Sequence, residues 1–95
     1  MNESNTKFIK FFKALANEER LEIIKLLKKN TEMYAQDVEK HFYLEQSTTS
    51  HHLNTLKRAG ITKSRKEGRN IYYSMDYENF QNTLKEFEGL VFDQP

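Results

Sequence analysis

Seven consecutive residues that can form hydrogen bonds, from Gln46 to His52, are the strongest chemical signal in this chain of 95 residues. A leucine pair, Leu53 and Leu56, and a basic dipeptide follow directly. If the segment is helical, its first two turns present small polar side chains that fit base edges, and its later turns present an apolar stripe for docking. The pattern is therefore typical of a helix that reads DNA, with base readers at its N-terminal end and anchors behind them.

The polar residues of this segment differ in how they contact DNA. A glutamine pairs bidentately with adenine, whereas serine and threonine hydroxyls bond to either bases or phosphates. Ser47, Ser50 and His51 are separated by three and four positions, so they share one helix face. The alternative is that Ser47 and Thr48 merely begin the helix. The predicted base readers are Gln46, Ser47, Thr48, Thr49, Ser50 and His51.

The adjacent histidines also suggest metal binding or catalysis, and both alternatives are weak. His51 and His52 would point about 100° apart on a helix, and His41 lies ten residues upstream, so joint zinc coordination is not expected. Ser50 and His51 likewise diverge, and no acidic orienting residue or oxyanion loop accompanies them, so the chain is not expected to be an enzyme. We expect His51 to contact DNA, and His52 to be partly buried or to face a phosphate.

Apolar periodicity predicts two helices before this segment. Phe8, Phe11 and Leu15 fall on one face of a first helix. Asn17 is the predicted N-cap of a second helix, which ends near Asn30 and has acidic residues in its first turn.

Two further helices and a hairpin follow. A connector at 31–32 leads to a short helix at roughly 34–42, and the polar helix covers roughly 46–59 with Gly60 as its terminator. Strand-forming residues at 61–66, a Glu67-Gly68 turn and a return strand at 70–74 predict a β-hairpin.

A last helix completes the predicted fold. Phe80, Leu84, Phe87 and Val91 recur at helical spacing. The predicted order is α-α-α-α-β-β-α, a mainly α winged helix-turn-helix with a small β-hairpin as the wing.

Basic residues concentrate in the middle of the chain. Residues 45–75 hold six basic and two acidic side chains, whereas residues 76–95 hold one basic and five acidic. This distribution predicts a local phosphate-facing surface; the alternative is a chance excess on a solvated face. The cations expected to contact the DNA backbone or minor groove are Lys57, Arg58, Arg65, Lys66 and Arg69.

Three segments together resemble the ArsR/SmtB-type winged-helix transcriptional regulators. They are FKALANEERLEIIKLL (12–27), QSTTSHHLNTLKRAG (46–60) and RKEGRNIYYS (65–74), in the order and spacing of that family. Thr49 departs from the pattern because it replaces a common small aliphatic residue. The resemblance implies a repressor that binds double-stranded DNA.

The resemblance also implies metal-ligand positions, which this chain leaves largely without ligands. The thiolate pair of the short third helix would fall near Tyr34 and Gln36, and the last-helix site near Tyr77, Asn79, Leu90 and Asp93. Of these residues only Asp93 is a plausible ligand, and soft or borderline metals need thiolate or imidazole. We therefore expect no metal, no cofactor and no metal response.

The terminal helices carry more large apolar residues than a domain of this size buries easily. One interpretation is that some of them close the monomer core. The resemblance favours instead a homodimer in which the first and last helices pair across a two-fold axis, which predicts an inverted-repeat operator. The predicted dimer residues are Phe8, Phe11, Phe12, Phe80, Leu84, Phe87 and Val91.

The composition predicts a single, mostly helical domain over residues 1–95. The chain has no cysteine, which excludes disulfides, thiol sensing and thiolate metal sites. It has no apolar run long enough to cross a membrane, and its polar N-terminus is unlike a secretion signal, so a cytoplasmic location is expected.

The leading interpretation is a homodimeric, sequence-specific DNA-binding repressor that senses neither metals nor thiols. Its signal is then a small-molecule effector, a protein antagonist or the level of its own expression. The alternative is a winged-helix module that binds protein and not DNA. The basic middle segment and the polar run at 46–52 argue against that alternative.

Overall fold

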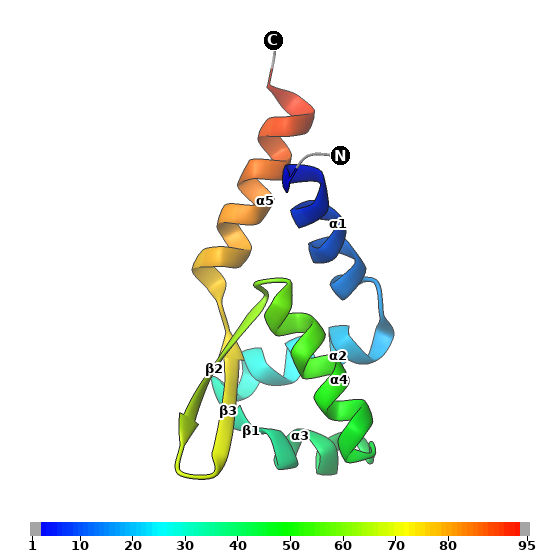
Figure 1. The fold of residues 1–95 in the computed structure, drawn as a ribbon, viewed down its shortest axis with the longest axis vertical. Coiled ribbons are helices and arrows are strands. Elements are labelled where there is room, and N and C mark those ends of the chain that lie inside the picture. The colour runs from blue at the N-terminus through cyan, green and yellow to red at the C-terminus, as the bar shows by residue number, and fades with distance from the viewer. Residues whose placement is uncertain (1–2, 94–95) are drawn as a thin grey trace.

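The computed structural model describes residues 3–93 as five helices and one three-stranded antiparallel sheet (Figure 1). The elements are α1 (Glu3–Leu15), α2 (Glu18–Asn30), β1 (Glu32–Tyr34), α3 (Ala35–Phe42), α4 (Gln46–Arg58), β2 (Thr62–Glu67), β3 (Asn70–Met75) and α5 (Tyr77–Phe92). The predicted winged helix-turn-helix is confirmed, with one strand more than expected.

Local chemistry sets two of the helix boundaries that the sequence predicted. The Asn17 side-chain oxygen accepts a hydrogen bond from the Arg20 backbone N–H at 3.0 Å, so Asn17 caps α2. Gly60 has a φ of 75° directly after the α4 C-cap. This left-handed conformation suits glycine and ends the helix.

Strand β1 was not predicted, and residues 31–34 are therefore not simply a connector followed by a helix. Met33 pairs with Tyr73 of β3, and the sheet order is β1-β3-β2. A strand of three residues is too short to show an alternating pattern, so its pairing depends on a partner about forty residues away in sequence. The third helix consequently begins at Ala35.

The hairpin matches its predicted position to within about a residue. Strands β2 and β3 pair from Thr62↔Met75 to Glu67↔Asn70, and Gly68 in the turn has a φ of 62°. Strand β3 packs against α2 and α3, whereas β2 contacts α4. These contacts tie the wing to the helix that precedes it.

One hydrophobic core is shared by the helices α1, α2, α3 and α4 and the sheet. Its buried members are Phe11, Ala14, Ile23, Leu27, Val38, Leu53, Leu56, Ile61, Tyr73 and Met75. Phe80 and Leu84 of α5 pack against this cluster while remaining partly exposed. The leucine pair of the polar helix thus anchors α4, as its sequence predicted.

The molecule is elongated, with extents of 48 × 22 × 21 Å. Helices α1 and α5 lie together and form one end, while α3, the N-terminus of α4 and the hairpin tip occupy the other (Figure 1). Among residues 3–93, no helix is both long and apolar enough to cross a membrane.

Candidate nucleic-acid interface

Helix α4 divides along its length into a buried face and an exposed face. Thr49, His52, Leu53 and Leu56 form the buried face, and none of them is more than 7% exposed. The solvent-exposed residues of α4 are Gln46, Ser47, Ser50, His51, Asn54, Lys57 and Arg58, and Thr48 is half-buried. Most of the predicted base readers therefore lie where a ligand could reach them.

A continuous polar stripe runs along the exposed face of α4. Ser47, His51, Asn54 and Arg58 are spaced by four, three and four residues, which places them within about 40° of one line along the helix. Asn54 was not among the predicted contacts, although its distance of seven residues from Ser47 would have identified it. Its side-chain amide offers the donor and acceptor pair that suits adenine.

Thr49 does not belong to this exposed surface, contrary to the prediction. Its side chain is 1% exposed, and its hydroxyl oxygen has no hydrogen-bond partner among the described residues. It follows Thr48 by one position, and this rotation of about 100° turns Thr49 into the core beside Leu53. Thr49 therefore cannot reach a base edge in this structure.

His52 is buried between α4 and α2, as one of the two alternatives for it predicted. It is 7% exposed; Arg20 Nη1 lies 3.2 Å from its Nδ1, and Glu19 Oε2 lies 3.0 Å from its Nε2. An imidazole protonated at Nε2 satisfies both contacts, because Nδ1 then accepts from Arg20 while Nε2 donates to Glu19. His52 thus links α4 to the start of α2, whereas its neighbour His51 faces solvent.

The wing holds Arg65 in a different role from the predicted DNA contact. Its guanidinium donates to both carboxylate oxygens of Glu32 at 2.7 and 2.8 Å and to Glu67, and it lies 4.6 Å from the Tyr72 ring centroid. The hydrogen bonds that Glu32 accepts from Arg65 hold the pKa of the Glu32 carboxyl below its usual range. The hydrogen bonds that Arg65 donates to Glu32 and Glu67 raise the pKa of the guanidinium. Arg65 therefore joins β1 to the hairpin, and its charge is already neutralised.

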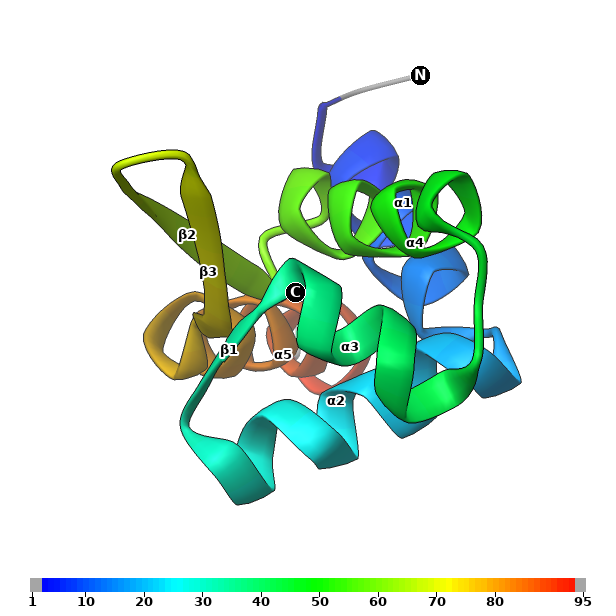
Figure 2. The same ribbon diagram turned by 90° about the horizontal axis from the view of Figure 1, so that it is seen from below.

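Of the predicted wing cations, Lys66 and Arg69 remain available to a ligand. Both side chains are exposed, and neither forms a side-chain hydrogen bond or ion pair within residues 3–93. Seen from below, the hairpin, α3 and α4 spread across the same end of the molecule (Figure 2). The free cations of the wing and the first turns of α4 thus share one end.

The dimer prediction mixed core residues with surface residues. Phe11 is 0% exposed and Phe8 is 7% exposed, and their rings contact Phe80 and Phe87 of the same chain at centroid distances of 5.1 and 5.4 Å. Both residues therefore close the core, as the alternative interpretation held, and Phe11 is not available to a second copy. Leu84 is half-buried against the same core.

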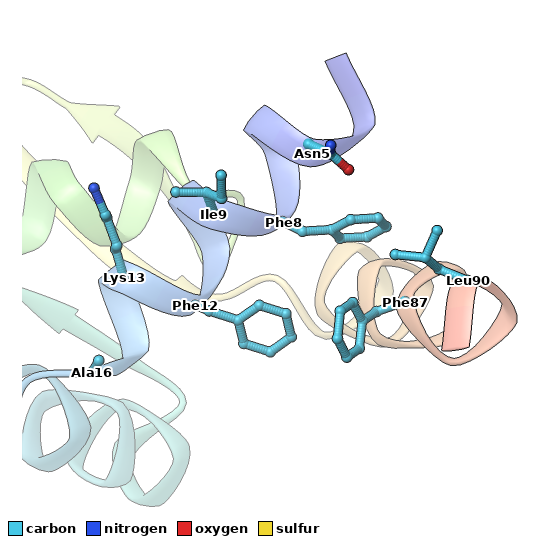
Figure 3. Close-up of a pocket in the computed structure, with 8 residues that line it drawn as sticks. All are labelled: Asn5, Phe8, Ile9, Phe12, Lys13, Ala16, Phe87 and Leu90. Carbon is cyan, nitrogen blue, oxygen red and sulfur yellow. The ribbon is translucent and has the colours of Figure 1, made fainter. Parts of the chain in front are cut away.

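An apolar groove nevertheless remains between α1 and α5. It has a volume of about 520 Å³, and Phe12 at its centre is 36% exposed (Figure 3). Val91, a predicted dimer residue, is 53% exposed. Three other apolar residues at this end are also exposed but were not among the predicted dimer residues: Ile9 (43%), Leu90 (60%) and Phe92 (73%). The residues lining the groove are Asn5, Phe8, Ile9, Phe12, Lys13, Ala16, Phe87 and Leu90.

The positions that the resemblance assigned to metal ligands have other roles. The Asn79 side-chain amide donates to the Gly60 carbonyl at 2.8 Å, the Tyr34 ring packs against Tyr72, and Asp93 is the C-cap of α5. Within residues 3–93, no group of three or more His, Cys, Asp or Glu side chains is placed to hold a metal ion.

Comparison with known proteins agrees with this geometry. The sequence profile described as "Bacterial regulatory protein, arsR family" matches residues 17–64, from the α2 N-cap into β2. An uncharacterized HTH-type transcriptional regulator of Methanocaldococcus jannaschii is 45% identical over 75 residues, which are 78% of this chain and 84% of that protein. The transcriptional repressor SdpR of Bacillus subtilis is 37% identical over 73 residues, covering 77% of this chain and 80% of the repressor.

A solved structure shares the whole architecture. It is the homodimeric winged helix-turn-helix DNA-binding domain of a possible ArsR-family regulator from Mycobacterium bovis, determined in solution by NMR. The TM-score is 0.73 at 25% sequence identity, and the match covers 94% of this chain and 83% of that one.

Proposed function

The chain belongs to the bacterial ArsR family of DNA-binding transcriptional regulators, and we propose that it is a homodimeric repressor that occupies an inverted-repeat operator. The observation that carries the proposal is the exposed polar stripe of α4, which lies at the same end of the molecule as the free cations of the wing. The SdpR relative is named a repressor, which supports this direction of control. The proposal places the protein in the cytoplasm, where the DNA is.

In this proposal α4 lies in the major groove and reads bases through the residues of its exposed face. Gln46 and Asn54 would pair with adenine, while Ser47, Ser50 and His51 would bond to base edges or to flanking phosphates. Thr48 is half-buried and would contribute only at the edge of the contact.

The cations set affinity more than sequence preference. Lys57 and Arg58 near the end of α4, and Lys66 and Arg69 on the wing, would contact phosphates or the minor groove. Each phosphate contact releases counterions, so the logarithm of the binding constant falls linearly with the logarithm of the salt concentration. A flat dependence on salt would contradict this part of the proposal.

The groove between α1 and α5 is the proposed dimer surface. The related M. bovis domain is described as homodimeric, which supports a second copy of the chain as the occupant. Phe12, Phe87, Leu90 and Val91 offer apolar area at the end of the molecule opposite the wing tip. A two-fold axis there would set two α4 helices about one turn of DNA apart, or a multiple of it. Sedimentation at micromolar concentration tests the dimer, and a monomeric mass would refute it.

We also propose that the repressor responds to neither metals nor thiol oxidation. The chain has no cysteine, and the last-helix ligand positions supply a carboxylate only at Asp93. Zinc should leave operator affinity unchanged. Release of DNA by zinc that disappears in Asp93→Ala would overturn this proposal. Control would then come from a small-molecule effector, from a protein antagonist or from the level of the repressor's own expression.

A gel-shift titration with the DNA upstream of the gene tests the function as a whole. Gln46→Ala and His51→Ala should each weaken binding to the footprinted site by about 1–3 kcal/mol, and the loss should shrink on unrelated DNA. Gln81→Ala, on the exposed surface of α5, is the matched control for Gln46→Ala and should leave DNA affinity unchanged. Failure of the wild-type protein to retard any DNA would favour the protein-binding alternative.

A further inference from the structure

A basic hollow lies between α1, the start of α2 and the second half of α4. Its volume is about 250 Å³, and four of its seven lining residues are basic, with no acidic residue among them. The lining residues are Lys10, Lys13, Ala14, Arg20, Thr55, Arg58 and Ala59. It shares only Arg58 with the exposed stripe of α4, and no residue of the wing lines it.

Three of these cations have no counter-charge. The side chains of Lys10, Lys13 and Arg58 form no hydrogen bond or ion pair with any residue in 3–93. By contrast, Lys7 on the same helix is 3.0 Å from Glu86. Like charges around one hollow repel one another until an anion enters, so the site favours a negatively charged ligand.

Arg20 contributes to the lining of the hollow a guanidinium whose position is fixed. Its Nε donates to the Ala14 carbonyl at 2.7 Å and its Nη2 to the Lys13 carbonyl at 3.1 Å, while Nη1 faces His52. A guanidinium held by two backbone carbonyls keeps its charge in place. Lys10, Lys13 and Arg58 can then close on an anion from around the rim.

The position of the hollow indicates which anion it meets. Arg58 ends the exposed stripe of α4 that begins at Ser47, and Lys13 also lines the apolar groove between α1 and α5. The hollow therefore lies between the proposed base-reading surface and the proposed dimer surface. In a two-fold dimer, a hollow from each copy would flank the axis, along the path of DNA that joins one recognition helix to the other.

We infer that this hollow binds backbone phosphates of the operator segment between the two half-sites. The inference rests on the proposed DNA binding and dimer, and it extends the interface onto α1. Such contacts carry no sequence information, but they position the two half-sites and strengthen binding to any DNA. Each phosphate contact contributes about 0.9 to the steepness of the salt dependence.

The test compares two double variants of equal charge. Lys10→Gln with Lys13→Gln removes four rim cations per dimer, whereas Lys28→Gln with Lys29→Gln removes four exposed cations from the end of α2, far from α4 (Figure 2). The first variant should reduce the salt slope by roughly 2–4 and weaken operator binding by roughly tenfold or more at 0.15 M salt. The second should leave both quantities near those of the wild type.

Modified DNA locates the contact. Neutral methylphosphonates placed between the half-sites should weaken binding of the wild-type protein and have little further effect on the variant at Lys10 and Lys13. Lys10 does not line the α1–α5 groove, so Lys10→Gln alone, with the dimer verified by sedimentation, separates a phosphate contact from a loss of pairing.

Three outcomes would overturn the binding of backbone phosphates by the hollow. Equal salt slopes for the two double variants would overturn it while leaving the proposed function intact. Stabilisation by inorganic phosphate or pyrophosphate that requires Lys10, combined with an unchanged DNA salt slope, would also overturn it and assign the hollow to a small anion. If the wild-type protein binds no DNA, the proposed function fails and the inference fails with it.

Discussion

Adjacent histidines on α4 should respond to mutation in opposite ways. His52→Ala is expected to destabilise the fold, because it removes a side chain that is 7% exposed and bridges Arg20 and Glu19. His51→Ala is expected to leave stability within about 0.5 kcal/mol, as is usual for exposed positions, and to weaken operator binding instead. Each variant therefore serves as the control for the other.

The structure sets the size of the His52 effect. The bond to Arg20 contributes about 1–1.5 kcal/mol, and the bond to Glu19, whose side chain is 51% exposed, contributes at most about 0.5–1 kcal/mol. Truncation of the buried ring adds about 1 kcal/mol for lost packing. The sum is about 3 kcal/mol, which corresponds to a fall in Tm of roughly 12–24 °C for a domain of this size.

Urea denaturation followed by circular dichroism measures the stability, and the operator titration measures the binding. His52→Gln should recover part of the loss, because the amide offers one donor and one acceptor. If His52→Ala destabilises the fold no more than His51→Ala does, His52 is not a structural link between α4 and α2. If His52→Ala changes base preference at unchanged stability, the imidazole faces DNA and not the core.

Three further predictions test the surroundings of α4. Gly60→Ala should cost about 2–3 kcal/mol of stability, because φ is 75° and the new Cβ would lie 2.0 Å from the Asn79 amide nitrogen. Gly68→Ala, with a φ of 62° and no atom beyond its chain neighbours within 4 Å of the new Cβ, should cost only about 1 kcal/mol, and equal urea midpoints for the two variants would contradict this. Thr49→Val should leave operator affinity unchanged and raise the free energy of unfolding by up to about 1 kcal/mol, and a loss of affinity would instead place Thr49 at the DNA. Arg65 lowers the folded-state pKa of Glu32, so the stability from this pair is present above the unfolded pKa of about 4.3 and is lost as the pH falls through the lower folded value. The difference in urea midpoint between the wild type and Glu32→Gln should therefore be largest near pH 7 and vanish in acid.

Much of the fold follows from local patterns in the sequence. Helical spacing located the five helices, Asn17 marked the start of α2, and Gly60 marked the end of α4. These signals depend on groups a few residues apart, such as a cap oxygen and the N–H it accepts from, so the chain carries them without its tertiary structure.

What each side chain faces was decided by tertiary packing. Strand β1 exists because β3 pairs with it, and the same pairing brings Glu32 to Arg65 and neutralises a predicted DNA contact. Segments distant in sequence also decide which side of α4 is covered, so Thr49 faces the core while the exposed stripe continues through Asn54.

The residue types of the site were therefore readable from the sequence alone, because polarity and spacing belong to single residues and their near neighbours. The sequence did not show which of these residues lie in the core, which pair across the sheet as Arg65 does, and which are exposed, because exposure depends on the segments that pack around each residue in the folded chain. His51 and His52 show the difference most simply: they are identical and adjacent in the chain, yet α2 encloses one through Glu19 and Arg20 and leaves the other to solvent.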